Sequence, residues 1–292
     1  MKEGRKFDQH GHYIGGAKDS PLDIRDYRYE LRAAMPTFPE QFLIKPKSIL
    51  NQGSVGSCVA HSLASLLENV LNKQFSTGWV YGYRPPIKGK DSDRDMQEGM
   101  YLREACNTLL KMGNVIYTTF PENIEVKPAV YLVDDRFDNL KNEAIKQKIK
   151  SYVNLGNGNN DTSRLQAKSW LYNNKMPILF SCNVYSGWYH NPFIKDTKVI
   201  IRAGENLGGH AMIILGWNKY GWIIQNSWGK NWNLGDNGIA TLSYDYPLKE
   251  LWGVEVERTD IPENERPIII KPTKLKIFIQ KIISFFQKLF KK

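Results

Sequence analysis

The chain of 292 residues contains three cysteines, and one of them, Cys58, stands in a context that suits a nucleophile. A turn rich in glycine and serine, residues 51–57, precedes it, and an apolar helical pattern follows it. The first turn of a helix presents unpaired N–H groups and the positive end of the helix dipole, which stabilise a thiolate relative to a thiol. Cys106 and Cys182 lack this context, and we interpret them as small buried hydrophobic residues.

A thiolate that attacks a carbonyl carbon needs a proton partner, normally an imidazole. Of the five histidines, only His210 lies in an apolar, strand-like run, although a histidine there can also be a satisfied core residue. Asn226 follows 16 residues later, on what we expect to be the adjacent antiparallel strand. Its amide could bond one ring nitrogen and leave the other to face the thiolate, while Trp228 shields that bond from water.

A further amide precedes the cysteine. Gln52 lies six residues before Cys58. Its side-chain N–H could point to the same place as the Cys58 backbone N–H, and two such donors would form an oxyanion hole.

Three sequence blocks, Gln52…Gly56-Ser57-Cys58, residues 209–211 and residues 225–229, resemble the active-site blocks of the papain and cathepsin family. They occur in that family's order, cysteine before histidine before asparagine. The resemblance covers about residues 38–256. It implies an α+β fold of two lobes, a helical lobe with Cys58 and an antiparallel β-rich lobe, with the active-site cleft between them. It also implies endopeptidase activity through a thioester acyl-enzyme on peptide or protein substrates.

Other positions match the family more loosely. Gly99 resembles the glycine whose backbone pairs with the substrate strand, but it could also be a plain glycine at a helix start. Leu102 then falls at the wall of the S2 pocket, and Ala211 is assigned to substrate binding as well. Val59 stands where an aromatic residue is usual, and we interpret His61 as a partly buried helix residue. The paired cysteines of secreted relatives are missing, which resembles bacterial or large-virus members of the family.

The pattern of elements fits this division. We expect helices at 59–71, 101–112, 139–152 and 163–173. After Pro177 the chain changes to short runs that are β-branched or aromatic, which predict strands at 178–184, 211–217, 221–227 and 238–244.

We divide the chain into four segments. Residues 38–259 form the peptidase-like domain, residues 260–273 a proline-containing linker and residues 274–292 a basic amphipathic helix. Residues 1–37 are a leader and a possible short propeptide, with Pro21–Tyr29 either lying along the cleft or disordered. We interpret His10 and His12 as part of a loose tail rather than a metal site.

The net charge of +10 comes mainly from the C-terminal segment, since eight basic and no acidic residues follow Glu265. The rest is nearly neutral and carries no zinc-finger or helix-turn-helix pattern, so we expect no nucleic-acid partner. On a helical wheel, residues 274–292 place lysines opposite an apolar arc, which predicts binding to anionic membrane surfaces. The same apolar face could instead dock on the peptidase domain or on a second copy.

The N-terminus has no apolar stretch typical of a signal peptide, and the cysteine count argues against a disulfide scaffold. Both favour a reducing intracellular compartment or a virion. No metal or cofactor is expected. Two alternatives remain open: another Cys–His acyl-transfer enzyme, related to transglutaminases or cell-wall amidases, and an inactive peptidase fold that serves as a binding protein.

Overall fold

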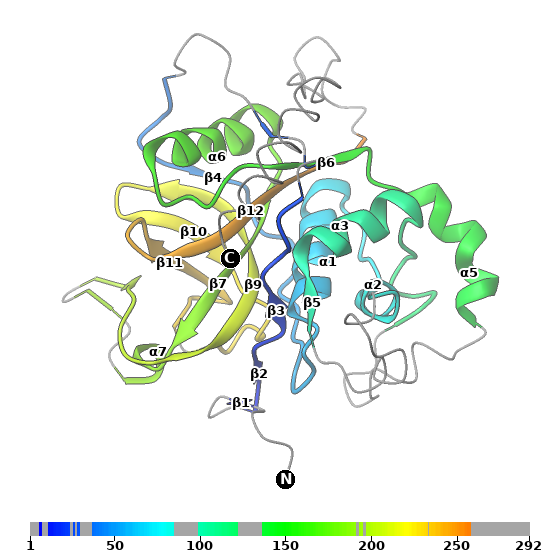
Figure 1. The fold of residues 1–292 in the computed structure, drawn as a ribbon, viewed down its shortest axis with the longest axis horizontal. Coiled ribbons are helices and arrows are strands. Elements are labelled where there is room, and N and C mark those ends of the chain that lie inside the picture. Colours follow the sequence, from blue (N-terminus) through cyan, green and yellow to red (C-terminus); the bar gives the residue numbers. More distant parts are fainter. Residues whose placement is uncertain are drawn as a thin grey trace, which may run out of the picture.

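The computed structural model describes residues 6–7, 11–23, 26, 28–29, 37–84, 99–121, 136–190, 193–194, 197–232 and 234–257. Figure 1 shows helices packed beside a twisted sheet, with an N-terminal strand running between the two. The predicted two-lobed α+β fold is therefore confirmed. The expected linker at 260–273 and the helix at 274–292 lie outside the described residues.

The helical lobe is built around one buried helix. Its elements are α1 (Cys58–Leu71), α2 (Thr77–Gly82), α3 (Leu102–Lys111), α5 (Arg136–Ala144) and the 3-10 turn η2 (Ile145–Gln147). The first eleven residues of α1 are all buried, so this helix is covered on every side rather than along one stripe. It packs against the sheet on one side and against α2 and α3 on the other, which fixes its N-terminus at the boundary between the lobes.

The β lobe is an eight-stranded sheet. Seven strands lie in the order β6-β12-β7-β9-β10-β11-β8, and β4 pairs with β9. The bounds are β4 (Phe42–Leu43), β6 (Ser151–Asn154), β7 (Ile178–Tyr185), β8 (Val199–Ile200), β9 (Asn206–Asn218), β10 (Gly221–Gln225), β11 (Ile239–Ser243) and β12 (Leu248–Glu255). All pairings are antiparallel except that of β8 with β11. Helices α6 (Asp161–Asn174) and α7 (Gly187–His190) belong to this lobe.

One helix was predicted to extend too far toward the C-terminus. The expected helix at 139–152 stops at Ala144, and residues 151–154 instead form β6. The reason is tertiary: Tyr152 and Val153 pair with Val254 and Gly253 of β12, a strand that the local pattern could not reveal.

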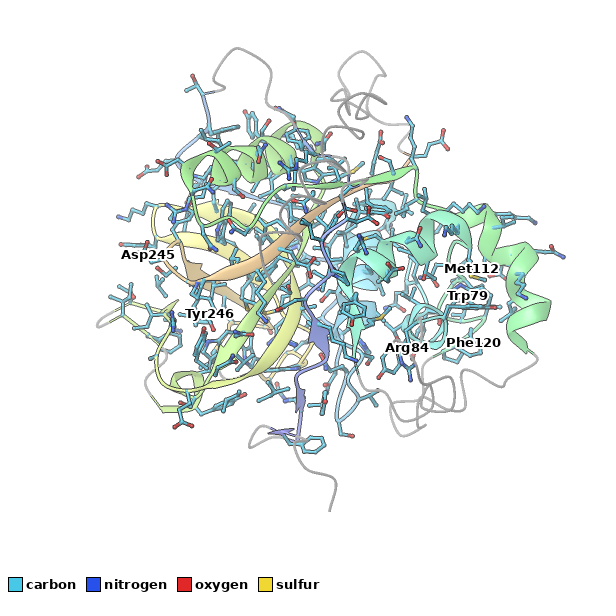
Figure 2. All side chains as sticks on the ribbon, in the orientation of Figure 1. Trp79, Arg84, Met112, Phe120, Asp245 and Tyr246 are labelled. Atoms are coloured by element: carbon cyan, nitrogen blue, oxygen red, sulfur yellow. The ribbon has the colours of Figure 1, made fainter. Side chains whose placement is uncertain are left out.

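Large aromatic side chains fill both lobes (Figure 2). Trp79, on α2, is fully buried in the helical lobe, where its indole N–H donates to Gly113 O at 3.1 Å. Tyr246 is buried in the β lobe and donates to Asn183 O at 2.6 Å. Two such cores make each lobe rigid enough to hold its own part of a shared site.

The N-terminal segment adds three short strands to this frame, and one of them pairs with a further short strand just before α3. They are β1 (Lys6–Phe7), β2 (Tyr13–Ile14), β3 (Ala17–Lys18) and its partner β5 (Met100–Tyr101). β1 pairs with β2 in antiparallel fashion, and β3 pairs with β5 in parallel. Residues 17 and 18 therefore pair with the strand that leads into α3, and this part of the N-terminus is not a free tail. Among the helices of the described ranges, none is long and apolar enough to span a membrane.

Candidate active site

Cys58 is the first residue of α1 and is fully buried. Backbone N–H groups of Ala211, from β9, of Val59 and of Cys58 itself face its sulfur. Burial raises the pKa of the Cys58 thiol to about 12, and these N–H bonds act in the opposite direction. The sulfur thus lies at the contact between the two lobes, with donors from both.

His210 and Asn226 are brought together as the spacing predicts. His210 is on β9, Asn226 follows the end of β10, and His210 Nε2 lies 2.8 Å from Asn226 Oδ1. The Ser227 backbone N–H also donates to that oxygen at 2.7 Å, which identifies it as the acceptor. His210 Nε2 therefore carries the proton, and Nδ1 is the nitrogen with a lone pair for acid–base chemistry.

Trp228 covers this pair. Its ring stacks on the His210 imidazole at a centroid distance of 4.4 Å and an interplanar angle of 28°. The indole is 2 % exposed, and His210 is fully buried. A hydrogen bond kept from water in this way is stronger than an exposed one, so the ring orientation is well fixed.

Gln52 is also fully buried, and its amide is held at both ends. Its Oε1 accepts from Ser227 Oγ at 2.7 Å, and its Nε2 donates to Val55 O at 3.0 Å. Since an amide nitrogen carries two hydrogens, one N–H remains for another acceptor. The sequence patterns missed Ser227 and Val55 as supports, because either residue type is also common in loops without such a role.

The three expected substrate-binding residues lie in different settings. Gly99 has φ +98°, a conformation that favours glycine, and it precedes β5. Leu102, the first residue of α3, is fully buried. Ala211 contributes its N–H to the Cys58 sulfur. Gly99 lies against an extended segment, since a Cβ added to it would be 2.6 Å from Gly16 O. Met100 and Tyr101, which the sequence patterns did not single out, pair with the same segment.

The segment beside Cys58 comes from the chain's own N-terminus. The Gly15 N–H donates to Gly209 O at 3.0 Å, and the Met100 N–H donates to Gly16 O at 2.9 Å. A Cβ added to Gly16 would lie 2.9 Å from the Cys58 sulfur. Residues 13–18, which we call the plug, therefore lie against both the nucleophile and β9.

Two expectations about the N-terminus are corrected. Pro21–Tyr29 was expected either along the cleft or disordered, but its described residues are held elsewhere: Arg103 Nη1 lies 3.1 Å from Asp23 and the Tyr29 N–H donates to Asn154 O at 3.1 Å. His12 was expected in a loose tail, but it is only 9 % exposed and stacks on Trp228 at 5.4 Å. Both contacts join positions far apart in sequence, so no local pattern could show them.

The described part of the chain contains no group of three His, Cys, Asp or Glu side chains arranged to hold a metal ion. All three cysteines are free thiols, so the expected lack of disulfides is confirmed. Burial raises the pKa of Cys106 and of Cys182 well above the ordinary value, and both lie fully inside the core. What the arrangement can do chemically is therefore acyl transfer by one buried thiol, an oriented imidazole and nearby N–H donors.

The chain is similar to known proteins both in sequence and in fold. A peptidase C1-like protein of Acanthamoeba polyphaga mimivirus, L477, is 24% identical over 245 residues, which are 77% of this chain and 75% of that protein. A cathepsin B-like cysteine proteinase of Caenorhabditis elegans is 36% identical over 66 residues, or 21% of this chain and 18% of that protein.

The fold is similar to that of xylellain, a cysteine protease from Xylella fastidiosa, with a TM-score of 0.72 and 21% identity over 88% of this chain and all of that chain. Procathepsin L2 from Tenebrio molitor gives a TM-score of 0.55 at 16% identity, over 85% of this chain and 78% of that chain. The model of the papain family of cysteine proteases matches residues 40–249. That match covers well over half of the sequence, and the chain therefore belongs to the papain family of cysteine proteases.

Proposed function

We propose that this protein is an active cysteine endopeptidase with Cys58 as nucleophile and His210 as base. The observation that supports it most is the 2.8 Å hydrogen bond from His210 Nε2 to Asn226 Oδ1, covered by Trp228. This bond leaves Nδ1 to take the thiol proton and later return it to the leaving amine.

The remaining roles follow from donors near the sulfur. The carbonyl oxygen of the scissile bond becomes an oxyanion when the thiolate attacks. The second Nε2–H of Gln52 and the Cys58 backbone N–H stabilise that charge. Ser227 and Val55 hold the Gln52 amide so that it need not reorganise during the reaction. Gly99 and Met100 pair with the substrate backbone as Met100 now pairs with the plug, and Leu102 packs beneath them.

The plug is proposed to be an inhibitor built into the chain. It occupies the space beside the sulfur and so adds to the burial of Cys58, and in the plugged chain that burial raises the pKa of the thiol to about 12. It therefore does two things: it blocks the carbonyl of a substrate and keeps the nucleophile protonated. The plugged chain is the resting form, and activity requires the plug to leave.

Cleavage of a peptide library separates this function from its alternatives. An endopeptidase cleaves internal peptide bonds. An amidase relative would cleave muramyl amides instead, and a transglutaminase relative would act on glutamine amides. Stoichiometric labelling of Cys58 by a peptidyl epoxide distinguishes an active site from an inactive binding fold. Failure of both epoxide labelling and peptide cleavage, in a folded chain without the plug, would contradict the proposal.

A second proposal concerns residues 274–292, outside the described part of the structure. On a helical wheel their apolar residues share one arc, and five lysines between Lys276 and Lys292 lie mainly opposite. We propose that this segment binds anionic membrane surfaces. Intact protein should sediment with anionic vesicles at low salt, and a chain truncated after Glu265 should not. Equal sedimentation of both would contradict the proposal and favour docking on the protein itself.

A further inference from the structure

The N-cap of α1 lacks the contact that caps other helices of this chain. At α2, the Ser76 Oγ accepts from the N–H of Trp79, three residues on, at 3.0 Å. At α6, Asn160 Oδ1 accepts from the N–H of Ser163 at 2.9 Å. The N-cap of α1 is also a serine, Ser57, yet its side chain makes no capping hydrogen bond. The residue type is that of the α2 N-cap, but the Ser57 backbone, at φ −95° and ψ 20°, is not extended as at Ser76 and Asn160, and its hydroxyl is directed elsewhere.

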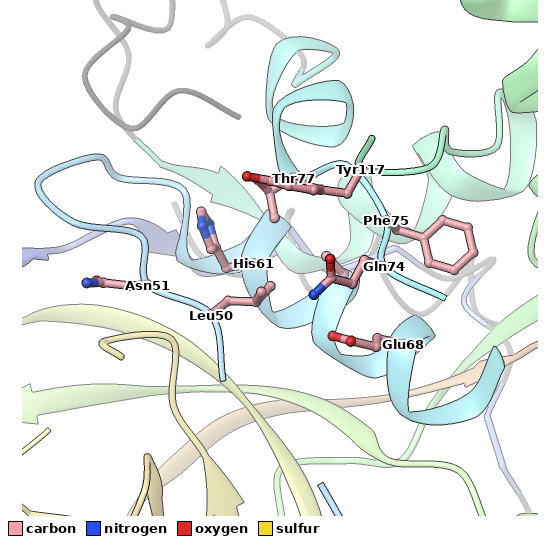
Figure 3. A pocket seen from close by; sticks show the side chains of 9 residues that line it. Leu50, Asn51, His61, Glu68, Gln74, Phe75, Thr77 and Tyr117 are labelled. Atoms are coloured by element: carbon pink, nitrogen blue, oxygen red, sulfur yellow. The ribbon is translucent and has the colours of Figure 1, made fainter. Parts of the chain in front are cut away.

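The partner of that hydroxyl is His61, one turn further along α1. The Ser57 Oγ lies 3.1 Å from His61 Nδ1, and Ser57 is fully buried. Nδ1 also lies 3.1 Å from the Ser57 carbonyl oxygen. The imidazole thus contacts both polar atoms of the residue before Cys58. Figure 3 shows the ring on the side of α1 that faces a cavity of about 210 Å³, which Asn51 and Glu68 also line.

The direction of the Ser57 hydroxyl matters because two acceptors, this hydroxyl and the Cys58 sulfur, can compete for the first-turn N–H groups of α1. A capping serine accepts from the second or third N–H of its helix, which here are those of Val59 and Ala60. The Val59 N–H bonds to the Cys58 sulfur and favours the thiolate. A Ser57 hydroxyl in the capping position would take that N–H group or its neighbour away from the sulfur.

We propose that His61 is a positioning residue that holds the Ser57 hydroxyl and so reserves the first-turn N–H groups of α1 for the Cys58 thiolate. The inference rests on the proposed role of Cys58 as nucleophile. The other ionisable groups of this region belong to different elements: Cys182 on β7 interacts with Cys58, and His210 on β9 and His12 in the N-terminal segment both stack on Trp228. None of them contacts Ser57 through the bonds described above, so a change at His61 acts on α1 first.

The test is the pH dependence of Cys58 alkylation by iodoacetamide in the full-length protein, followed by peptide mass spectrometry. Every variant also carries Gly16→Val, because a Cβ on Gly16 would lie 2.9 Å from the Cys58 sulfur and should keep the plug away from it, so the midpoints report the uncovered thiol. His61→Phe should raise the midpoint by about half a pH unit and lower the neutral-pH rate about threefold. Ser57→Ala should change the rate less than twofold. The double variant should behave like Ser57→Ala, because no hydroxyl is left to compete.

Two more variants keep the result interpretable. His61→Asn places a polar atom near the position of Nδ1 and should keep the midpoint of the Gly16→Val parent. His61→Gln places it nearer to Nε2 and should shift the midpoint as His61→Phe does, which repeats the test if the phenylalanine variant does not fold. An unshifted midpoint in the variants without Nδ1 overturns the inference, and so does a shift that persists in the double variant. Absence of any titrating alkylation at Cys58 in the Gly16→Val parent, whose plug should be open, would instead count against the proposed function.

Discussion

Gly16 lies directly against Cys58. A Cβ on Gly16 would lie 2.9 Å from the sulfur and 2.6 Å from the carbonyl oxygen of Gly56. Only a residue without a side chain fits at this point of the plug, because the second contact is with backbone that cannot turn away. The glycine thus allows the N-terminal segment to close over the nucleophile.

Gly16→Val should open the cleft, because its side chain cannot be accommodated against Gly56. We expect kcat/KM on a short fluorogenic peptide to rise by about tenfold or more, since the resting form is destabilised by at least about 1.4 kcal/mol. Gly11→Ala in the same segment is the control for backbone strain alone: its φ is +80°, so alanine strains the chain there, but nothing lies within 4 Å of the added Cβ. Equal kcat/KM for Gly16→Val and the wild type would show that the plug does not inhibit.

The segment that follows the plug is held by Arg103, which pairs with Asp23 and Asp26. The strength of this docking should depend on pH through Asp26. Burial raises the pKa of Asp26 to about 6, and the nearby Arg103 opposes that shift. A carboxyl with a raised pKa binds its proton more tightly when docked, so docking is strongest below the ordinary value near 3.8 and weakens as pH rises through about 6. Burial also raises the pKa of Glu250, which accepts from the Ser20 N–H, so its contribution has the same sign.

Hydrogen exchange measures this dependence, with rates corrected for the intrinsic effect of pH. Protection of residues 19–29 should fall between pH 5 and pH 7 in the wild type. In Asp26→Asn the decrease should be smaller, because one titrating group is gone. A greater protection at pH 7 than at pH 5 would mean that the ion pairs with Arg103 outweigh the cost of burying the carboxylate, contrary to our expectation.

Gln52→Ala should slow the chemical step. Loss of an oxyanion donor costs about 2–4 kcal/mol of transition-state stabilisation, with little change in KM. Ser227→Ala is the informative companion, since it removes only the hydroxyl that fixes Gln52 Oε1, and we expect a smaller loss in kcat. Steady-state kinetics on the Gly16→Val background gives both values. A Gln52→Ala effect confined to KM would place the amide in ground-state binding instead.

Much of the site could be predicted from local patterns. Cys58 follows a turn that must lead into a helix, and His210 and Asn226 occupy strands whose spacing allows a hairpin. Each motif carries its own structural context, so the bond between His210 and Asn226 at 2.8 Å follows from the order of elements.

The plug could not be predicted in this way. Gly15 and Gly16 bind Gly209 and Met100 through backbone atoms, which leave no signature in side-chain type. The stacking of His12 on Trp228 joins residues more than 200 positions apart. The strand at 151–154 was missed for a related reason, since its partner β12 decides its conformation. Such long-range contacts are fixed by tertiary structure rather than by local propensity.

The central claim is that the Cys58 thiol attacks peptide bonds, and one measurement tests it most directly. Initial rates of peptide cleavage should be compared for Gly16→Val and for Gly16→Val with Cys58→Ala, with circular dichroism to verify that both are folded. The second substitution removes one small buried atom group, so the fold should persist while turnover falls to the uncatalysed background. Undiminished kcat in the variant without the thiol would contradict the account.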